Sequence, residues 1–382
     1  MGTGKQRRRL VISAVNFTEG GPLSILKDCL AEAVACLGDD YEVVALVHRA
    51  ALVGVAGVRY LEYPGAKSSW VRRIYLEYRG FRELSLELDA DLWLSLHDMT
   101  PKVTARRRAV YCHNPAPFHS LTARDAWLDP GFALFRFFYG IFYRINIRAN
   151  DYVIVQQEWL RERFRKDFAV DKVVVAHPAI RVPPAASREP SHPGSAGETR
   201  FIYPALGRVF KNFEIIGEAA RLLQARGCDN FEVLLTVDGS ENRYTRFVRD
   251  NFDDLSSLKF LGRQSRDQVY SLYGSADGLI FPSRLETWGM PISEFKPTGK
   301  PLLAADLPYA HETVGDYSNA AFFDPNCAES LARQMLAVIE GKFVPAMPGG
   351  RIPAPPFVHD WPGLFRLLLA TQAGITAKES AG

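Results

Sequence analysis

Apolar and polar positions follow a regular order along this chain, in which short apolar runs alternate with longer amphipathic stretches. The runs are rich in β-branched residues and bounded by turn-forming residues, a pattern that predicts buried strands. The stretches between them predict helices. The expected strands are residues 10–15, 42–47, 92–96, 109–112, 152–155 and 172–176, followed by 199–204, 231–237, 258–261, 278–282 and 301–304. Such alternation indicates parallel sheets covered by helices on both faces.

A stretch rich in Pro, Ser and Gly interrupts this alternation near the middle of the chain. We interpret residues 183–198 as a linker between an N-terminal domain, residues 1–182, and a C-terminal domain, residues 199–355. A chain of 382 residues is long for one domain and ordinary for two.

The composition narrows the class of protein. Hydrophobic residues make up 47% of the chain and aromatic residues 12%, enough for packed cores and too much for a disordered protein. The five cysteines are scattered and lack paired spacing, so we expect no disulfide framework, no zinc site and a cytoplasmic location. The basic residues 5–9 precede only a short apolar run, which predicts a first strand rather than a signal peptide. We see no apolar stretch long enough to span a bilayer.

The charge is distributed unevenly between the two halves. Residues 1–185 hold 26 basic and 20 acidic residues, whereas the remainder holds 20 basic and 23 acidic residues. A basic half suits an anionic membrane or a nucleic acid. Because no RNA-binding signature or interleaved aromatic platform is present, we expect no nucleic-acid partner.

The strongest motif consists of two carboxylates eight residues apart, Glu286 and Glu294, with a glycine and a proline between them. The motif follows the expected strand 278–282, and a proline at position 291 suits the first turn of a helix. The backbone N–H groups of Gly289 and Met290 then lie at a helix N-terminus, where anions bind. This order suits a nucleotide sugar: one carboxylate for sugar hydroxyls, the amides for the diphosphate and the second carboxylate for a ribose.

The motif resembles the Glu-x7-Glu motif of the retaining family 4 glycosyltransferases, which have the GT-B fold. Upstream, the sequence Gly-Arg-Val-Phe-Lys-Asn at residues 207–212 is similar to the family's Gly-Arg…Lys element. In that family the two cations, here Arg208 and Lys211, hold the donor diphosphate. The Arg and Lys stand closer together here than in the commoner form. Residues 260–273, which include Arg263, resemble the segment that meets the base.

One further departure and two weaker signals complete the resemblance. Pro297 should end the helix that begins near residue 290, where the family continues it. Gly20 and Gly21 lie in the first expected strand-to-helix loop, where glycine permits close approach of a ligand. His97 and His113 each follow an expected strand, at the sheet edge where ligands of α/β proteins bind. The family places a histidine after the strand that matches 109–112, so His113 is preferred.

The resemblance implies an α/β protein with the GT-B fold, in which two doubly wound Rossmann-like domains face a central cleft. It also implies that a last helix, residues 356–376, packs back on the N-terminal domain. The implied activity is transfer of a hexose, with retention, from a nucleotide-diphosphate sugar to a saccharide, without metal or cofactor. The donor base, UDP or GDP, is left open. Arg208 and Lys211 would stabilise the diphosphate, Glu286 and His113 would hold the sugar, and Glu294 the ribose.

Residues 111–118 resemble bacterial members that assemble surface polysaccharide, lipopolysaccharide or O-antigen, which implies a saccharide acceptor that is lipid-linked. Two alternatives stay open: another GT-B enzyme, such as a nucleotide-sugar epimerase or a glycogen-type synthase, and a catalytically silent subunit that binds sugar nucleotides.

Residues 132–148 form an aromatic stretch that permits two interpretations. At helical spacing its three arginines fall on one arc and its aromatics cover the rest. It is either an interfacial helix on an anionic membrane, which would place the protein at the inner face of the plasma membrane, or a buried helix with a solvated edge. The basic residues that would meet lipid are Arg72, Arg73, Arg106, Arg107, Arg108, Arg136 and Arg144.

Overall fold

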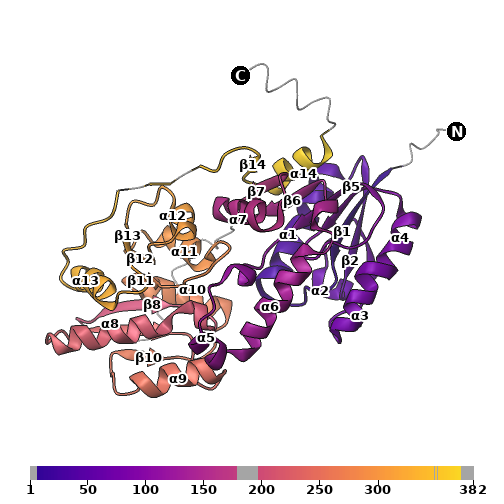
Figure 1. Cartoon of the computed structure of the whole chain (residues 1–382). Helices are drawn as coiled ribbons and strands as arrows, with labels where there is room; N and C mark the ends of the chain where they lie inside the picture. The colour runs from indigo at the N-terminus through magenta and orange to yellow at the C-terminus, as the bar shows by residue number, and fades with distance from the viewer. Residues whose placement is uncertain (1–6, 179–196, 348, 351, 371–382) are drawn as a thin grey trace. The chain divides into compact units, whose positions relative to one another are not determined.

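The computed structural model describes residues 7–178, 197–347, 349–350 and 352–370. The chain forms two compact units, drawn in Figure 1. The N-terminal unit comprises Met1–Asn114, Tyr139–Ala179 and Pro353–Gly382, and the C-terminal unit comprises Pro115–Phe138 and Ile180–Ile352. Each contains a parallel sheet with helices, so the prediction of two Rossmann-like α/β domains is confirmed.

The sheet of the N-terminal unit has eight strands in the order β14-β7-β6-β5-β4-β1-β2-β3. Its strands are β1 Arg8–Ala14, β2 Tyr41–Val47, β3 Val58–Glu62, β4 Ala90–Ser95, β5 Ala105–Tyr111, β6 Tyr152–Val155, β7 Val173–Ala176 and β14 Phe357–Val358. All neighbouring strands run parallel, with Leu10 of β1 paired to Val43 and to Leu92. The chain order reverses between β1 and β4, which marks this sheet's switch point.

Alternate residues of β1 supply two separate cores, one on each face of the sheet. Leu10 and Ile12 pack on one face, and Val11 packs on the other with Phe81. The helices of this unit are α1 Gly20–Leu37, α2 Ala50–Val53, α3 Trp70–Tyr75, the π-helix η1 Leu76–Gly80, α4 Phe81–Leu88, the 3-10 turn η3 Ile147–Ala149, α7 Glu158–Phe168 and α14 Trp361–Leu369. Both faces of the sheet are therefore buried, as a parallel sheet requires.

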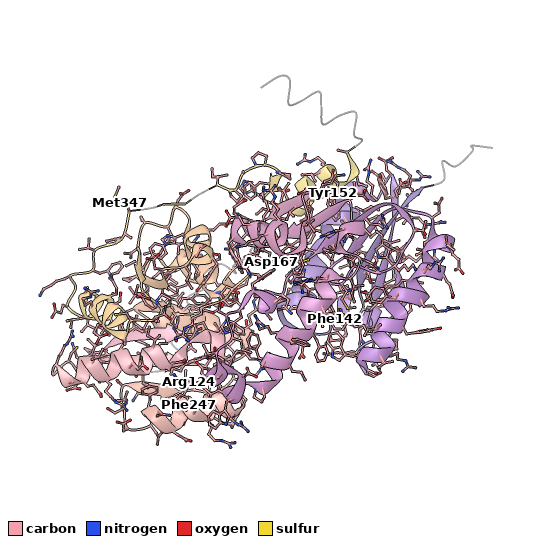
Figure 2. All side chains as sticks on the ribbon, viewed as in Figure 1. Arg124, Phe142, Tyr152, Asp167, Phe247 and Met347 are labelled. Carbon is pink, nitrogen blue, oxygen red and sulfur yellow. The ribbon has the colours of Figure 1, made fainter. Side chains whose placement is uncertain are left out.

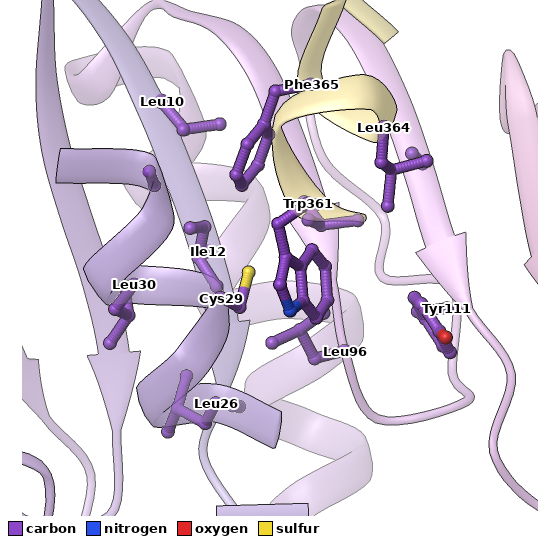
Figure 3. Packing of buried hydrophobic residues seen from close by; sticks show 14 of the residues in the cluster. Leu10, Ile12, Leu26, Cys29, Leu30, Leu96, Tyr111, Trp361, Leu364 and Phe365 are labelled. Atoms are coloured by element: carbon purple, nitrogen blue, oxygen red, sulfur yellow. The ribbon is translucent and has the colours of Figure 1, made fainter. Parts of the chain in front are cut away.

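The final helix α14 packs on the first helix of the chain. Trp361 and Leu364 join the core cluster that contains Leu26 and Cys29 of α1, as Figure 3 shows. The two residues of β14 just before it pair with β7, Phe357 opposite Val175. The helix expected over 356–376 is thus shorter at its start, because the chain there first extends the sheet. Residues 371–376 lie outside the described ranges.

The sheet of the C-terminal unit has six strands in the order β10-β9-β8-β11-β12-β13. They are β8 Thr199–Tyr203, β9 Phe231–Leu235, β10 Leu258–Phe260, β11 Gly278–Phe281, β12 Leu302–Ala305 and β13 Ala320–Phe323. Its helices are α8 Phe213–Ala225, α9 Arg243–Phe252, α10 Arg266–Ser275, α11 Met290–Phe295, α12 Pro308–Val314 and α13 Ala328–Ile339, with 3-10 turns η4 Val209–Lys211 and η5 Lys296–Thr298. The chain order reverses between β8 and β11, so the loops after these two strands start side by side.

The segment Pro115–Phe138 belongs to the C-terminal unit although it lies between β5 and β6 in the sequence. It contains η2 Ala116–Phe118, α5 Ala123–Leu128 and the start of α6 Pro130–Arg144. Arg243 Nη1 donates to the Trp127 carbonyl at 2.9 Å, and the Arg124 guanidinium lies 4.9 Å from the Phe247 ring centre (Figure 2). The N-terminal domain expected over residues 1–182 includes this segment, whereas in the structure the segment belongs to the C-terminal unit.

The expected linker, residues 183–198, lies almost wholly outside the described ranges, so the expected boundaries stay a prediction. One local expectation is confirmed: α11 ends at Phe295 and continues as the 3-10 turn η5 around Pro297. In the described ranges, no helix combines the length and apolar character needed to cross a membrane.

Candidate active site

The loops that follow β8 and β11 are fastened to one another at the switch point of the C-terminal unit. Asn212 is fully buried with a φ of 59°, and its side-chain amide donates to the carbonyls of Pro282 (3.2 Å) and Pro325 (2.9 Å). The Arg284 N–H donates to the Phe210 carbonyl at 2.7 Å. These bonds fix the backbone on either side of Lys211 and just before Glu286.

Lys211 and Glu286 form an ion pair between Nζ and Oε1. Their side chains are only 16% and 14% exposed. The ammonium also lies 5.4 Å from the Phe210 ring centre and 5.9 Å from that of Phe281. The sequence predicts that Lys211 contacts phosphate and that Glu286 contacts sugar, each separately. In the structure the two side chains contact one another.

Glu294 lies on α11 and is held by side chains of α10. Its two carboxylate oxygens accept hydrogen bonds from the hydroxyls of Tyr270 (3.3 Å) and Tyr273 (3.2 Å), and Arg266 Nη2 lies 3.7 Å away. Burial raises the pKa of Tyr270 and Tyr273, so both remain protonated donors at neutral pH. Sequence reasoning gave these tyrosines no role. Their spacing of three residues on one helix was the available signal.

Gly289 and Met290 lie where the sequence predicts, at the start of a helix. Met290 is the first residue of α11, and Gly289 precedes it with a φ of 84°, a conformation that favours glycine. A Cβ at this position would approach the Phe281 ring to 3.3 Å. The helix has only six residues, so any attraction for an anion comes from local N–H groups more than from a long helix dipole.

The two arginines of the expected donor site have different surroundings. Arg208 Nη1 lies 3.2 Å from both carboxylate oxygens of Asp129, a residue that the sequence did not indicate. Arg263 is exposed in the turn before α10. Gly207 has no room for a side chain, since a Cβ would meet Thr245 Cγ2 at 2.1 Å.

The remaining candidates lie in the N-terminal unit. Gly20 and Gly21 begin α1, with open space around both. His113 follows β5 and stacks on Tyr111 with ring centres 4.2 Å apart. Burial lowers the pKa of His113 to about 3, against the weaker opposing effect of the Leu96 carbonyl, so the ring is neutral at physiological pH.

Asp98, in the loop after β4, organises the backbone beside His113. Its carboxylate accepts hydrogen bonds from the His113 N–H (2.5 Å) and from the hydroxyls of Tyr143 (3.0 Å) and Tyr139 (3.2 Å). Its φ of 68° is unusual for a residue with a side chain. Burial raises the pKa of Asp98. The sequence gave no signal for this carboxylate beyond its place after a strand.

His97, the alternative to His113, is fully enclosed. Its Nε2 lies 3.0 Å from Ser13 Oγ and 3.2 Å from Glu77 Oε1, and Arg73 Nη2 donates to its carbonyl at 3.2 Å. Burial lowers the pKa of His97 well below its usual range. The ring of His97 thus has its partners inside the fold. The ring nitrogens of His113 are buried too, but they have no hydrogen-bond partner among the described residues, which favours His113 as the candidate.

The aromatic stretch expected over 132–148 forms α6, followed by η3, and exposes one apolar face. The exposed large apolar residues of this stretch are Leu134, Phe135, Phe137, Phe138, Ile141 and Ile145. The alternative of a buried helix with only an arginine edge exposed is therefore wrong for these side chains. In the N-terminal unit, Trp70 of α3 stacks on Phe142 with ring centres 5.3 Å apart, so α3 lies beside this part of α6.

The expected basic surface is smaller than the sequence indicates. Arg73 is buried against Glu77 and His97, and Arg136 donates to the His119 carbonyl at 2.6 Å. Arg106 pairs with Asp91 at 2.7 Å, and Arg107 donates to the Leu368 carbonyl at 3.0 Å. Arg72, Arg106 and Arg144 remain exposed. In the part of the chain that the structure describes, no cluster of three His, Cys, Asp or Glu residues is arranged to hold a metal ion.

Residues 189–347 match the sequence model of the family described as Glycosyl transferases group 1. An uncharacterized glycosyltransferase of Methanocaldococcus jannaschii is 31% identical to this chain over 114 residues. That match covers 30% of this chain and 32% of the archaeal protein, so it spans about a third of the relative's length.

Solved structures resemble nearly the whole chain. A glycosyltransferase from Rickettsia africae has a TM-score of 0.64 at 15% identity, covering 88% of this chain and 89% of its own. WaaG, a glycosyltransferase involved in lipopolysaccharide biosynthesis, has a TM-score of 0.60 at 13% identity, covering 86% and 90%. Anabaena HepE in complex with UDP-glucose has a TM-score of 0.56 at 14% identity, covering 87% and 90%.

At these identities the likeness to solved structures establishes the fold alone. The family match adds the type of domain, since it supports a glycosyltransferase domain over residues 189–347. The chain has the two-domain GT-B fold, and its residues 189–347 match the group 1 glycosyltransferase domain.

Proposed function

We propose that this protein is a retaining hexosyltransferase of the family 4 type that uses a nucleotide-diphosphate sugar as donor. The observation that carries the proposal is the contact between Lys211 and Glu286 at the switch point of the C-terminal unit. A carboxylate beside a cation suits a ligand whose hydroxyls and phosphate are neighbours, and a sugar 1-phosphate has that arrangement. The match of residues 189–347 to the group 1 family supports the assignment.

In this proposal the donor extends from Lys211 towards Glu294. Lys211 and Arg208 bind the diphosphate, and Glu286 accepts hydrogen bonds from sugar hydroxyls. Glu294 accepts hydrogen bonds from the ribose, and the tyrosine hydroxyls on its two oxygens fix the direction of the remaining lone pairs. Arg263, Gly289 and Met290 flank the base and the phosphates.

The chemical step exchanges one C–O bond for another on the same face of the sugar. The bond from the anomeric carbon to the diphosphate breaks, and the bond to the acceptor oxygen forms. The departing diphosphate oxygen takes the acceptor's hydroxyl proton. Lys211 and Arg208 stabilise the charge that develops on this oxygen, a contribution that a metal ion makes in other phosphate sites. We therefore propose that transfer needs neither metal nor cofactor.

His113 acts on the sugar as a neutral hydrogen-bonding group in this proposal. A histidine whose pKa is about 3 is not in its imidazolium form at physiological pH, so it cannot act as a general acid. Gly20 and Gly21 leave room for the sugar or the acceptor near the start of α1. We therefore propose that His113 binds and orients the substrate.

A binding screen followed by an activity assay tests the proposal. Thermal shifts with UDP-, GDP- and dTDP-sugars identify the base, and the complex of HepE with UDP-glucose makes UDP-sugars the first choice. Slow donor hydrolysis without acceptor distinguishes an enzyme from a silent binding subunit. A stereoisomer of the donor in the products indicates an epimerase, and elongation of a soluble glucan indicates a glycogen-type synthase. Loss of all donor shifts in Lys211→Ala supports the site, whereas unchanged shifts contradict it.

The two carboxylates of the motif are expected to give different kinetic signatures. Glu294→Ala should mainly raise KM for the donor, because a ribose contact is similar in the ground and transition states. Glu286→Ala should mainly lower kcat, because a contact to the transferring sugar strengthens as charge develops. Identical profiles for the two variants would show that these roles are misassigned.

The acceptor is proposed to be a lipid-linked saccharide at the inner face of a bacterial membrane, in the assembly of lipopolysaccharide or O-antigen. The observation in favour is the exposed apolar surface on α3 and the adjoining part of α6. Its residues are Trp70, Val71, Tyr75, Ile141 and Ile145. The exposed Arg72 and Arg144 lie on the same two helices, and each basic residue near anionic lipid adds about 1 kcal/mol.

Co-sedimentation with vesicles tests this membrane contact. We expect salt-sensitive binding to anionic vesicles, weakened in the double variant Arg72→Glu/Arg144→Glu and unchanged in the matched control Arg226→Glu/Arg246→Glu, whose arginines are exposed in the C-terminal unit. Equal binding by both double variants would contradict the assignment of the surface. No binding by the unmodified protein would favour a soluble acceptor.

A further inference from the structure

Asp129 connects the segment Pro115–Phe138 to the loop that carries the proposed phosphate ligands. It lies between α5 and α6 and is 6% exposed. Its Oδ1 accepts a hydrogen bond from the Phe132 N–H at 3.1 Å, in the first turn of α6. Both carboxylate oxygens also lie 3.2 Å from Arg208 Nη1. One buried side chain therefore caps a helix and holds an arginine.

The contact restrains only one end of the Arg208 guanidinium. The side chain is 48% exposed. Among the described residues, none accepts a hydrogen bond from its Nε or Nη2. A guanidinium has five N–H donors arranged in a planar fork. With Nη1 held by Asp129, the donors on Nε and Nη2 stay available for a bidentate contact of the kind that suits a phosphate.

The backbone around Arg208 is already fixed, so the side chain is the part that needs restraint. Asn242 Nδ2 donates to the Gly207 carbonyl at 2.6 Å, and the Lys211 N–H donates to the Arg208 carbonyl at 2.8 Å. An exposed arginine otherwise loses much rotamer freedom when it binds a ligand. A carboxylate that orients it beforehand reduces this loss, as carboxylates do for metal-bound histidines.

The same segment also packs on the residue next to Lys211. The Phe132 ring lies 5.0 Å from the Phe210 ring, and the buried His119 ring lies 6.2 Å from it. Both cations of the proposed donor site thus stand on a loop that residues from another part of the sequence support.

We propose that Asp129 is a positioning residue for Arg208, which presents the guanidinium to the diphosphate of the donor. The proposal rests on the proposed function, because it assigns a role within the donor site. Asp129 does not touch the donor itself. Its negative charge orients Arg208, and its second bond to the start of α6 keeps the carboxylate in place.

The variant Asp129→Asn separates the charge of this residue from its role as a helix cap. Asparagine is as good an N-cap as aspartate and has nearly the same shape, so it keeps an acceptor for the Phe132 N–H. It loses the charge that attracts Arg208. Asp129→Ala serves as the structural control, because it removes both functions and should lower the melting temperature.

Binding of UDP and GDP to the full-length protein, measured by calorimetry at fixed ionic strength, reads out the effect. Asp129→Asn should raise the Kd of the nucleotide that binds by about three- to fivefold, the range of a partly exposed ion pair, with an unchanged melting temperature. In an Arg208→Gln background the same substitution should leave Kd unchanged. This non-additivity is what a purely structural role would not produce.

Four outcomes overturn the proposal. A lower Kd for Asp129→Asn would mean that Asp129 competes with the donor for Arg208. An equal effect in the wild-type and Arg208→Gln backgrounds would mean that Asp129 acts through the fold alone. Unchanged Kd in Asp129→Asn, with weakened binding in Lys211→Ala, would reject this inference but keep the donor site. If Arg208→Gln and Lys211→Ala both bind like wild type, the donor site itself is wrong.

Discussion

Replacement of Lys211 by alanine should lower the stability of the C-terminal unit as well as donor binding. Seen in the sequence alone, a loop lysine is a solvated side chain whose loss leaves the fold intact. In the structure its side chain is 16% exposed and pairs with Glu286, which is 14% exposed. The substitution therefore leaves a largely buried carboxylate without its cation. Breaking a fully buried pair costs about 3–5 kcal/mol, and partial access of water reduces this to about 2–3 kcal/mol.

Hydrogen exchange of peptides from β8 and β11, measured across a urea series, reports on this unit without assuming that the whole chain unfolds in one step. Lys211→Met keeps the aliphatic stem beside Phe281 and should lose about the same stability as Lys211→Ala, since the charge dominates. Glu286→Gln should cost less, and the double variant Lys211→Met/Glu286→Gln should recover most of the loss.

Two results would refute this reasoning. If Lys211→Ala stays within about 0.5 kcal/mol of wild type, as surface substitutions usually do, then the pair is solvated and its burial is not maintained in solution. If the double variant is as unstable as the sum of its parts, the two side chains do not interact. Activity of Lys211 variants should be compared only at urea-free conditions where each remains folded.

Three further outcomes are expected. Gly207→Ala should destabilise the protein by about 1–3 kcal/mol because its Cβ overlaps Thr245 Cγ2, and Thr245→Ser, which removes that methyl, should restore most of the loss on thermal melting. The pKa of His113 is about 3 in the folded protein against 6.5 in the unfolded chain, so between these pH values the unfolded chain binds more protons. The free energy of unfolding should therefore fall as the pH drops from 6.5 towards 3, by at most about 1.4 kcal/mol per pH unit. The fall should be less steep in His113→Gln. Arg161→Met should increase proteolysis around residues 354–356, whose three carbonyls accept bonds from this buried guanidinium; wild-type digestion rates would contradict that role.

The sheets were predictable because most of their strands are buried on both faces and appear as continuous apolar runs. All eleven expected strands are present. The three that sequence reasoning missed have weaker local signals. β3 is an edge strand that carries Arg59 and Glu62, and β14 has only two residues, so the apolar pattern is weak in both. β13, at the edge of the other sheet, is wholly apolar, but a run of four residues cannot be told from part of a buried helix by its pattern.

The candidate site was predictable in its order along the chain and not in its contacts. Motif spacing and turn chemistry located Glu286, Gly289 and Glu294 on the correct elements. The pairing of Lys211 with Glu286 joins residues 75 positions apart, a choice that depends on how two loops pack. Asp129 had no local signal at all, because its partner Arg208 is 79 positions away. The roles of these residues in binding a donor stay predictions.

The pairing of β14 with β7 has a consequence for how the protein forms during its synthesis. β7 ends at Ala176, but its outer neighbour in the sheet and the helix that covers α1 come only with Phe357–Val358 and Trp361–Leu369. At roughly 5–20 residues per second, the ribosome needs about 10–40 s to add that stretch. During this interval β7 is an open edge, and the apolar surface that receives Trp361 is bare. The C-terminal unit's own sheet is complete before then. Nascent chains should therefore still depend on chaperones late in synthesis, until residues 357–369 have been added. Products that stop before residue 357 should aggregate through the N-terminal half.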